Sequence, residues 1–99
     1  MIKHISMGVF KENAEGHSKK ENMEKAKELS LNMREIHELS RIEIGFNFMD
    51  APGACDFVSY SEYKDMDAVK AVISHPLHDK LVDFLKKVTE KTHSVTYKV

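Results

Sequence analysis

Residues 2–10 alternate between two faces in a way that predicts a β-strand. Ile5, Met7 and Val9 share one face by the two-residue period of a strand. The opposite face holds the remaining residues, which are Ile2, His4, Ser6, Gly8 and Phe10. Neither face is wholly polar, so we expect other parts of the structure to cover both faces of this strand.

A helical period replaces the alternation after a polar loop at residues 11–17. Ser18 and Glu21 are three residues apart and match a capping box, which predicts a helix start at this point. One apolar stripe follows at spacings of three and four residues, formed by Met23, Ala26, Leu29, Met33 and Ile36. That spacing is typical of an amphipathic helix packed on a core.

Two more strands follow this helix. Residues 41–49 and 55–63 both alternate, and Ile42, Ile44, Phe46 and Phe48 share one face of the first of them. The turn residues Asp-Ala-Pro-Gly at 50–53 lie between the two segments. We therefore expect an antiparallel strand pair with a turn between its strands.

The last third of the chain predicts a helix in two pieces and a final strand. Asp65 is a suitable N-cap for the short first piece. The second piece is predicted over 75–91, since Pro76 fits the first position of a helix. Residues 92–99 predict the closing strand.

The resulting order, βαββαβ, predicts one domain over residues 1–99 with a ferredoxin-like α+β fold. In this fold, one antiparallel sheet carries its helices on one face. The face with Ile5, Met7 and Val9 then has no helix to cover it. We expect a second copy of the chain to cover it, which gives a homodimer packed sheet against sheet into an α+β barrel.

Charge and composition narrow the choice of partners. Fifteen basic residues nearly balance sixteen acidic ones, so the chain has no strong field for nucleic acid or acidic membranes. No stretch approaches the roughly 18 apolar residues of a membrane span, and the N-terminus lacks the pattern of a signal peptide. Cys55 is the only cysteine and forms no internal disulfide. These observations predict a cytoplasmic protein without nucleic-acid or membrane partners.

Three features in chain order suggest a family. Lys3 and His4 lie in the first strand, Gly45 lies in the second, and His75-Pro76 is followed by His78. In this order and spacing they resemble the stress-responsive A/B barrel family, often called Dabb domains. The resemblance covers the chain from residue 2 to residue 97 and implies a dimeric α+β barrel.

The resemblance also bears on chemistry. Most members of the family have no assigned activity, and one branch contains polyketide cyclases of the aldol type. In that branch the second histidine of the His-Pro segment acts as base, and it corresponds to His78 here. A tyrosine just before the segment positions the substrate in the cyclases, whereas this chain has Val72 at that place.

His4, His75 and His78 are the candidate catalytic residues. Pro76 places His75 at or beside the N-cap, where a hydrogen-bonding role is the simpler interpretation. His78 lies in the first helical turn, where the helix dipole favours a neutral ring that can accept a proton. The His-x-x-His spacing alone is too common to indicate zinc, which needs three or four ligands. We expect no metal and no cofactor.

Small residues near His4 predict a space between the sheet and the helices. Ser6 and Gly8 follow His4 on its face, and Ser59 and Ser61 share one period of a later strand. The expected lining residues are Ser6, Phe57, Ser59, Val72, Ile73, Leu81 and Val82. A mostly apolar pocket of this kind suits a small apolar or aromatic ligand. The alternative is that methionine and phenylalanine side chains fill the space completely.

Two functions follow from these alternatives. The first is a dimeric domain of unassigned biochemical activity that binds a small molecule or is purely structural, with its histidines in a hydrogen-bonded cluster. The second is a cofactor-free enzyme of the cyclase or lyase type, in which His78 is the general base in the pocket. A cofactor-free oxygenase or haem-degrading protein of the same barrel type has less support, since the chain has no tryptophan.

Overall fold

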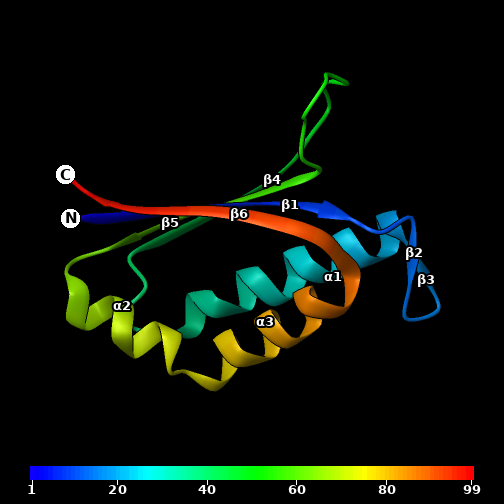
Figure 1. Ribbon diagram of the computed structural model, residues 1–99. Helices are drawn as coiled ribbons and strands as arrows, with labels where there is room; N and C mark the ends of the chain where they lie inside the picture. The colour runs from blue at the N-terminus through cyan, green and yellow to red at the C-terminus, as the bar shows by residue number, and fades with distance from the viewer.

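Four strands form one antiparallel sheet in the computed structural model, which describes residues 1–99 (Figure 1). Their order across the sheet is β4-β5-β1-β6. The strands are β1 (Ile2–Phe10), β4 (Arg41–Phe46), β5 (Phe57–Tyr63) and β6 (Thr89–Lys98). This topology confirms the ferredoxin-like α+β fold that the hydrophobic pattern predicts.

The helices lie together on one face of this sheet (Figure 1). They are α1 (Lys19–Asn32), the 3₁₀ turn η1 (Met33–Glu35), α2 (Met66–Ile73) and α3 (Pro76–Val88). The predicted caps are confirmed. Ser18 and Glu21 form a capping box at α1, and the Asp65 carboxylate accepts from the Ala68 N–H at 2.9 Å.

The core lies between the helices and the even-numbered residues of β1. At one end Ile2 packs in a large cluster with residues of α1, α2 and α3. At the other end Phe10 packs against Ala26, Phe57 and Val88. Between these two clusters, the helix-facing positions of β1 hold His4 and Ser6, which are only half-buried.

The opposite face of the sheet has no helix over it (Figure 1). Met7, Val95 and Tyr97 lie on this open face and are 40%, 51% and 38% exposed. The segment between β4 and β5 projects away from the helices on the same side, and its Phe48 is 91% exposed. Isolated soluble domains rarely expose so many large apolar side chains on one side.

Four predicted boundaries are wrong, two on either side of residues 88–92 and two around the turn between β4 and β5. The second piece of helix ends at Val88, and β6 begins at Thr89 instead of residue 92. Thr89 already pairs with Phe10 of β1, so sheet pairing overrides the helical pattern of the preceding residues. The strand predicted over 41–49 ends at residue 46, and its partner begins at residue 57, so the connecting turn is longer than expected.

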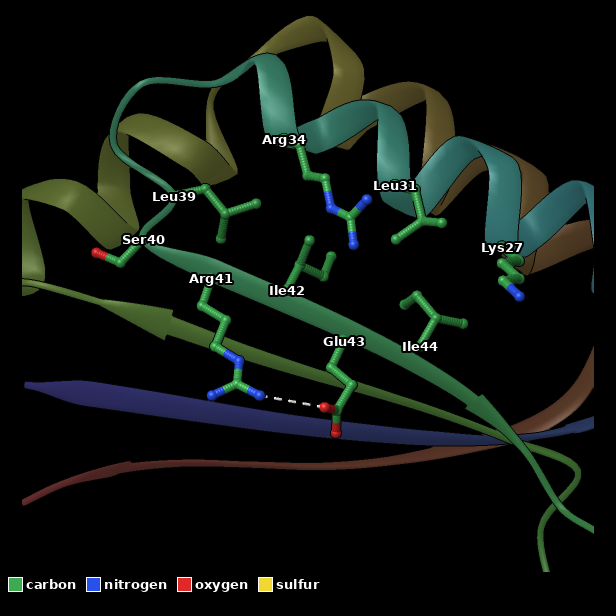
Figure 2. A pocket seen from close by; sticks show the side chains of 9 residues that line it. All are labelled: Lys27, Leu31, Arg34, Leu39, Ser40, Arg41, Ile42, Glu43 and Ile44. Atoms are coloured by element: carbon green, nitrogen blue, oxygen red, sulfur yellow. Dashed lines mark hydrogen bonds and ion pairs between the residues drawn. The ribbon is translucent and has the colours of Figure 1, made fainter.

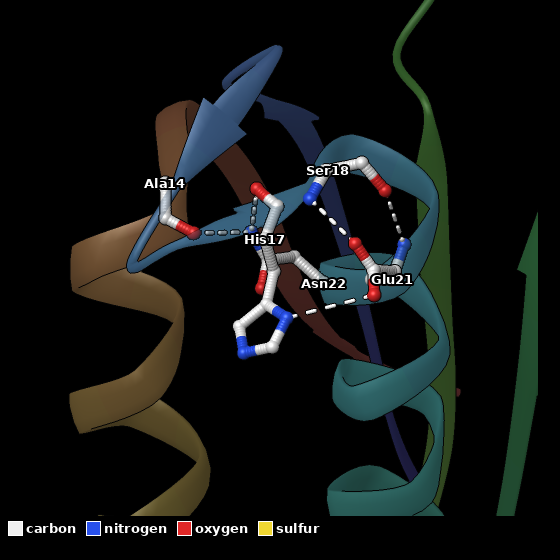
Figure 3. A network of polar contacts seen from close by, with 5 residues as sticks. All are labelled: Ala14, His17, Ser18, Glu21 and Asn22. Carbon is white, nitrogen blue, oxygen red and sulfur yellow. Dashed lines mark hydrogen bonds and ion pairs between the residues drawn. The ribbon is translucent and has the colours of Figure 1, made fainter.

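The polar loop before α1 contains a small hairpin, made of β2 (Asn13–Ala14) and β3 (His17–Ser18). Both turn residues, Glu15 and Gly16, have positive φ, as a tight two-residue hairpin requires. Figure 3 shows how this hairpin joins α1, because the buried Asn22 amide donates to the Ala14 carbonyl at 3.0 Å. His17 lies 3.6 Å from Glu21, whose pKa is lowered by the hydrogen bond from the Ser18 N–H.

No helix of the protein has the length and apolar character needed to cross a membrane. The cytoplasmic location stays a prediction from the sequence.

Candidate functional site

A cavity of about 330 Å³ lies between the sheet and the helices. His4 enters it from β1, and His78 enters it from the first turn of α3. Ser6, Ser59 and Leu81 lie in its wall, as do Phe57 and Val82. The cavity therefore combines two imidazoles with hydroxyl groups and apolar side chains.

The cavity exists because the central strands carry small side chains where the helices pass over them. In the antiparallel register Ser6 lies opposite Ser59, and His4 lies opposite Ser61. Ser94 is the other neighbour of Ser6, from β6. Serine side chains do not reach the helices, so the layer between sheet and helices stays open at this point.

His4 is held in place by Thr96 of the edge strand β6, since its Nδ1 lies 2.7 Å from the Thr96 Oγ1. Burial lowers the pKa of His4, and the charge of a protonated His78 lowers it further. The His4 ring is therefore neutral near pH 7. When Nδ1 donates to Thr96, the ring has Nε2 free to accept a proton or hydrogen bond.

This lowered pKa predicts a pH-dependent stability. The unfolded chain binds the His4 proton more tightly than the folded chain does, so acid favours unfolding. We expect the free energy of unfolding to fall as the pH drops below the ordinary histidine pKa of 6.5. Urea unfolding at about pH 7.5 and about pH 5.5 measures this change. His4→Gln should reduce the change in unfolding free energy between these two pH values. An equal change in the variant and the native protein would contradict the role of His4.

The third predicted histidine is not in the cavity. The backbone N–H of Leu77 donates to the His75 Nδ1 at 3.1 Å, and His75 is the N-cap of α3 with Pro76 after it. The structural interpretation of His75 thus agrees with its contacts. Two other predicted lining residues are corrected here. Val72 is fully buried in the core cluster and Ile73 points outward from α2, so neither lines the cavity.

The cap contact of His75 predicts a stability effect without a binding effect. His75→Ala removes the acceptor of the Leu77 N–H and should cost about 1 kcal/mol of stability. His75→Asn supplies another cap acceptor and should stay within about 0.5 kcal/mol of the native protein. Thermal unfolding of both variants measures the difference. A larger loss of ligand binding than of stability in His75→Ala would show a role in the site.

Sequence reasoning missed several residues of the site. Thr96 holds His4, and Tyr63, whose hydroxyl accepts from the Ser61 hydroxyl at 3.2 Å, lies on the cavity wall. The remaining lining residues not predicted include Ser30, Met33, Ile42, Leu85, Lys86, Thr92 and Ser94. The alternation of β6 could have suggested Thr92, Ser94 and Thr96, but only the strand order shows that β6 lies beside β1.

No group of three or more histidine, cysteine, aspartate or glutamate residues lies close enough together to hold a metal ion. The fold and the cavity together define a ferredoxin-like α+β domain with an internal space of ligand size. The chain matches the family described as "Stress responsive A/B Barrel Domain" over residues 2–99. It therefore belongs to the stress-responsive A/B barrel, or Dabb, family. None of the curated protein sequences compared with it matches.

Solved structures with the same fold agree with this assignment. A dimeric ferredoxin-like protein of unknown function from Thermobifida fusca has a TM-score of 0.84 at 18% identity, covering 99% of this chain and 90% of that one. A Dabb family protein from Mesorhizobium loti has a TM-score of 0.69 at 23% identity, with 99% and 95% covered. A hydroxynitrile lyase from Passiflora edulis has a TM-score of 0.82 at 14% identity, with 99% and 92% covered.

Proposed function

We propose that this protein is a homodimer that binds a small apolar or aromatic molecule in the cavity between its sheet and its helices. The observation that carries the proposal is that His4 and His78 both line a cavity of about 330 Å³. Ligand pockets combine apolar walls with a few polar groups that orient the ligand, and this cavity has that composition. A hydroxyl or carbonyl group of the ligand would contact the imidazoles.

The open face of the sheet supports the dimer. Met7, Val95 and Tyr97 are exposed there, and the 47–56 segment extends beyond the same face with Phe48 and Met49 exposed. A second copy that packs sheet to sheet, related by a two-fold axis, buries all of these side chains in the interface. The Thermobifida fusca neighbour is described as dimeric, which is consistent with this arrangement. The helices stay on the outside of such a dimer, so each protomer keeps its own cavity.

A second candidate function is proton abstraction without a cofactor. The neutral ring of His4 and the position of His78 in the first turn of α3 both favour a base in the cavity. The hydroxynitrile lyase among the structural neighbours has the same fold. In this function His78 accepts the proton next to a carbonyl or nitrile group, and His4 holds the second polar group of the substrate.

Titration of the ¹⁵N,¹³C-labelled protein with p-cresol tests the binding proposal, and NMR spectra of the protein report the binding. We expect saturable shifts of the His4 and His78 ring signals and of the Met33 methyl signal, because all three line the cavity. Native mass spectrometry of the freshly purified protein runs in parallel, and bound extra mass would identify a natural ligand.

Ser59→Leu and Ile73→Ala are the matched variants for this test. Ser59→Leu fills the cavity with an apolar side chain and should weaken p-cresol binding about tenfold or more. Ile73→Ala changes a side chain on the outside of α2 and should leave binding unchanged. The proposal fails if p-cresol shifts no cavity signal, or if both variants bind it as the native protein does.

A further inference from the structure

The histidine cavity has two chemically different ends. His4 and His78 are at one end, close enough that a protonated His78 adds to the effect of burial in lowering the pKa of His4. Thr89, the residue after α3, pairs with Phe10 at the far end of β1, so α3 runs in the same direction as β1. Lys86, near the end of α3, therefore lies at the opposite end of the cavity from the two imidazoles.

Helix and strand geometry give the same distance between these ends. His78 and Lys86 are eight residues apart on α3, which is about 12 Å along the helix axis. His4 and Gly8 are four residues apart on β1, which is about 13 Å along the strand. Val82 lies midway between the two charged or titratable residues of α3 and lines the cavity on the same side of the helix. The cavity is therefore long enough for one ligand to contact both ends.

Lys86 is the only residue with a fixed charge among those that line the cavity. None of the others is an aspartate or a glutamate, and Lys86 forms no ion pair within the chain. Thr92 lies at the same end, because it pairs with Gly8 in the sheet, and its hydroxyl is a further hydrogen-bond donor. A carboxylate accepts hydrogen bonds from donors of both kinds.

Interaction with the helix dipole is the simpler role for a lysine in the last turn of α3. Lys87 serves that role equally well, because it lies in the same turn. Lys86 differs from Lys87 in that its side chain lines the cavity. The two neighbouring lysines therefore allow an effect on the helix to be separated from an effect on the ligand.

We propose that the ligand of the cavity is an elongated monocarboxylic acid, with its carboxylate at Lys86 and a hydroxyl or carbonyl group at His4 and His78. This inference rests on the proposed binding function and adds the charge of the ligand to it. Leu81 and Val82 lie between the two ends and contact the aromatic or aliphatic middle part of the acid. Lys86 is then the residue that selects an acid over a neutral molecule of the same shape.

A different group of cations lies outside this cavity. Lys27 and Arg34 line a hollow between α1 and β4 (Figure 2). Glu43 also lines this hollow and pairs with Arg41 at 3.2 Å. No histidine lines it, so an acid that binds there leaves the ring signals of the two cavity histidines unchanged. Those signals distinguish the two locations.

NMR titrations of the full chain with three probes test the proposal. The acid is p-hydroxyphenylpropanoate, its neutral counterpart is p-hydroxyphenylpropanol, and p-cresol lacks the side chain of both. We expect the acid to shift the His4 and His78 ring signals. It should bind about threefold to fivefold more tightly than the alcohol, which is the size of effect for a solvent-exposed charge pair. Added salt should reduce this difference, because exposed charges are screened.

Lys86→Gln and Lys87→Gln are the matched variants. Lys86→Gln should bring the Kd of the acid to within about twofold of the Kd of the alcohol, and it should leave binding of the alcohol and of p-cresol unchanged. Lys87→Gln removes the same charge from the same helical turn outside the cavity, so the acid should still bind more tightly than the alcohol. Arg34→Gln removes a cation from the hollow in Figure 2 and should have no effect on any of the three probes.

The outcomes separate this inference from the binding function beneath it. If p-cresol and the alcohol bind in the cavity but the acid binds no more tightly, the inference is overturned and the binding function stands. The same holds if Lys86→Gln and Lys87→Gln change binding of the acid equally. If none of the three probes shifts the histidine signals, both proposals are overturned. Acid binding that leaves these signals unchanged and is lost in Arg34→Gln would overturn the inference and place the anion in the hollow beside β4.

Discussion

The variant with Met7→Lys and Val95→Lys is expected to be a monomer under conditions in which the native protein is a dimer. Both residues lie on the open face of the sheet, and Met7 and Val95 are 40% and 51% exposed in the single chain. In a two-fold dimer each substitution occurs twice, so four ammonium groups enter one interface. Burying unpaired charges of one sign costs several kcal/mol, which corresponds to a Kd raised by about a hundredfold or more.

Sedimentation equilibrium over a range of protein concentrations measures this change. Ile73→Lys is the matched control, since Ile73 is 54% exposed but lies on α2, on the helix side. The control should remain a dimer and should unfold at the same temperature as the native protein. A double variant that stays dimeric would place the interface elsewhere. If the native protein is monomeric at every concentration, the proposed sheet-to-sheet dimer is wrong.

Phe10→Ala is expected to cost about 3–5 kcal/mol of folding free energy, the range for large aromatic residues in cores. Phe10 is 1% exposed, and its ring centroid lies 5.6 Å from that of Phe57. Its loss leaves a cavity among Ala26, Val88 and Phe57, which are held by α1, α3 and β5 and cannot all move inward. For a domain of about 100 residues, a loss of this size lowers Tm by well over 10 °C.

Urea unfolding at one fixed protein concentration measures the Phe10→Ala effect, since dimer stability depends on concentration. Met66→Ala serves as control, because Met66 is 49% exposed on α2 and its truncation should change stability by no more than about 0.5 kcal/mol. A loss below about 1 kcal/mol in Phe10→Ala would contradict the tight packing of this end of the core.

To predict the candidate site from the sequence, one has to infer which side chains lie close together in the folded chain. Local signals placed His75 correctly, because a proline after it and a helical pattern beyond it define an N-cap. Small residues on one strand face suggested a space around His4 and His78, with a completely filled core as the alternative. The structure has a cavity there, and Ser6, Phe57, Ser59, Leu81 and Val82 lie in its wall. Whether these histidines bind or catalyse stays a prediction.

Val72 and Ile73 show why local reasoning reached only part of the site. Both were expected to line the cavity, and Val72 stands at the place of the cyclase tyrosine. Consecutive residues of a helix point about 100° apart, so on α2 Val72 packs into the core while Ile73 faces outward. Thr96 was missed because it is distant from His4 in sequence but close to it in the fold. It is 92 residues from His4 in sequence and becomes its partner only through pairing of β1 with β6.

The order of the main strands and helices, the helix caps and the buried faces could be read from the sequence, because these depend on periodicity and on residues within a few positions of each other. The folded molecule was needed to show where β6 begins, how far the 47–56 segment extends, and which residues enclose the cavity. These features depend on pairing between residues far apart in the chain, and no local pattern encodes the strand order that sets them.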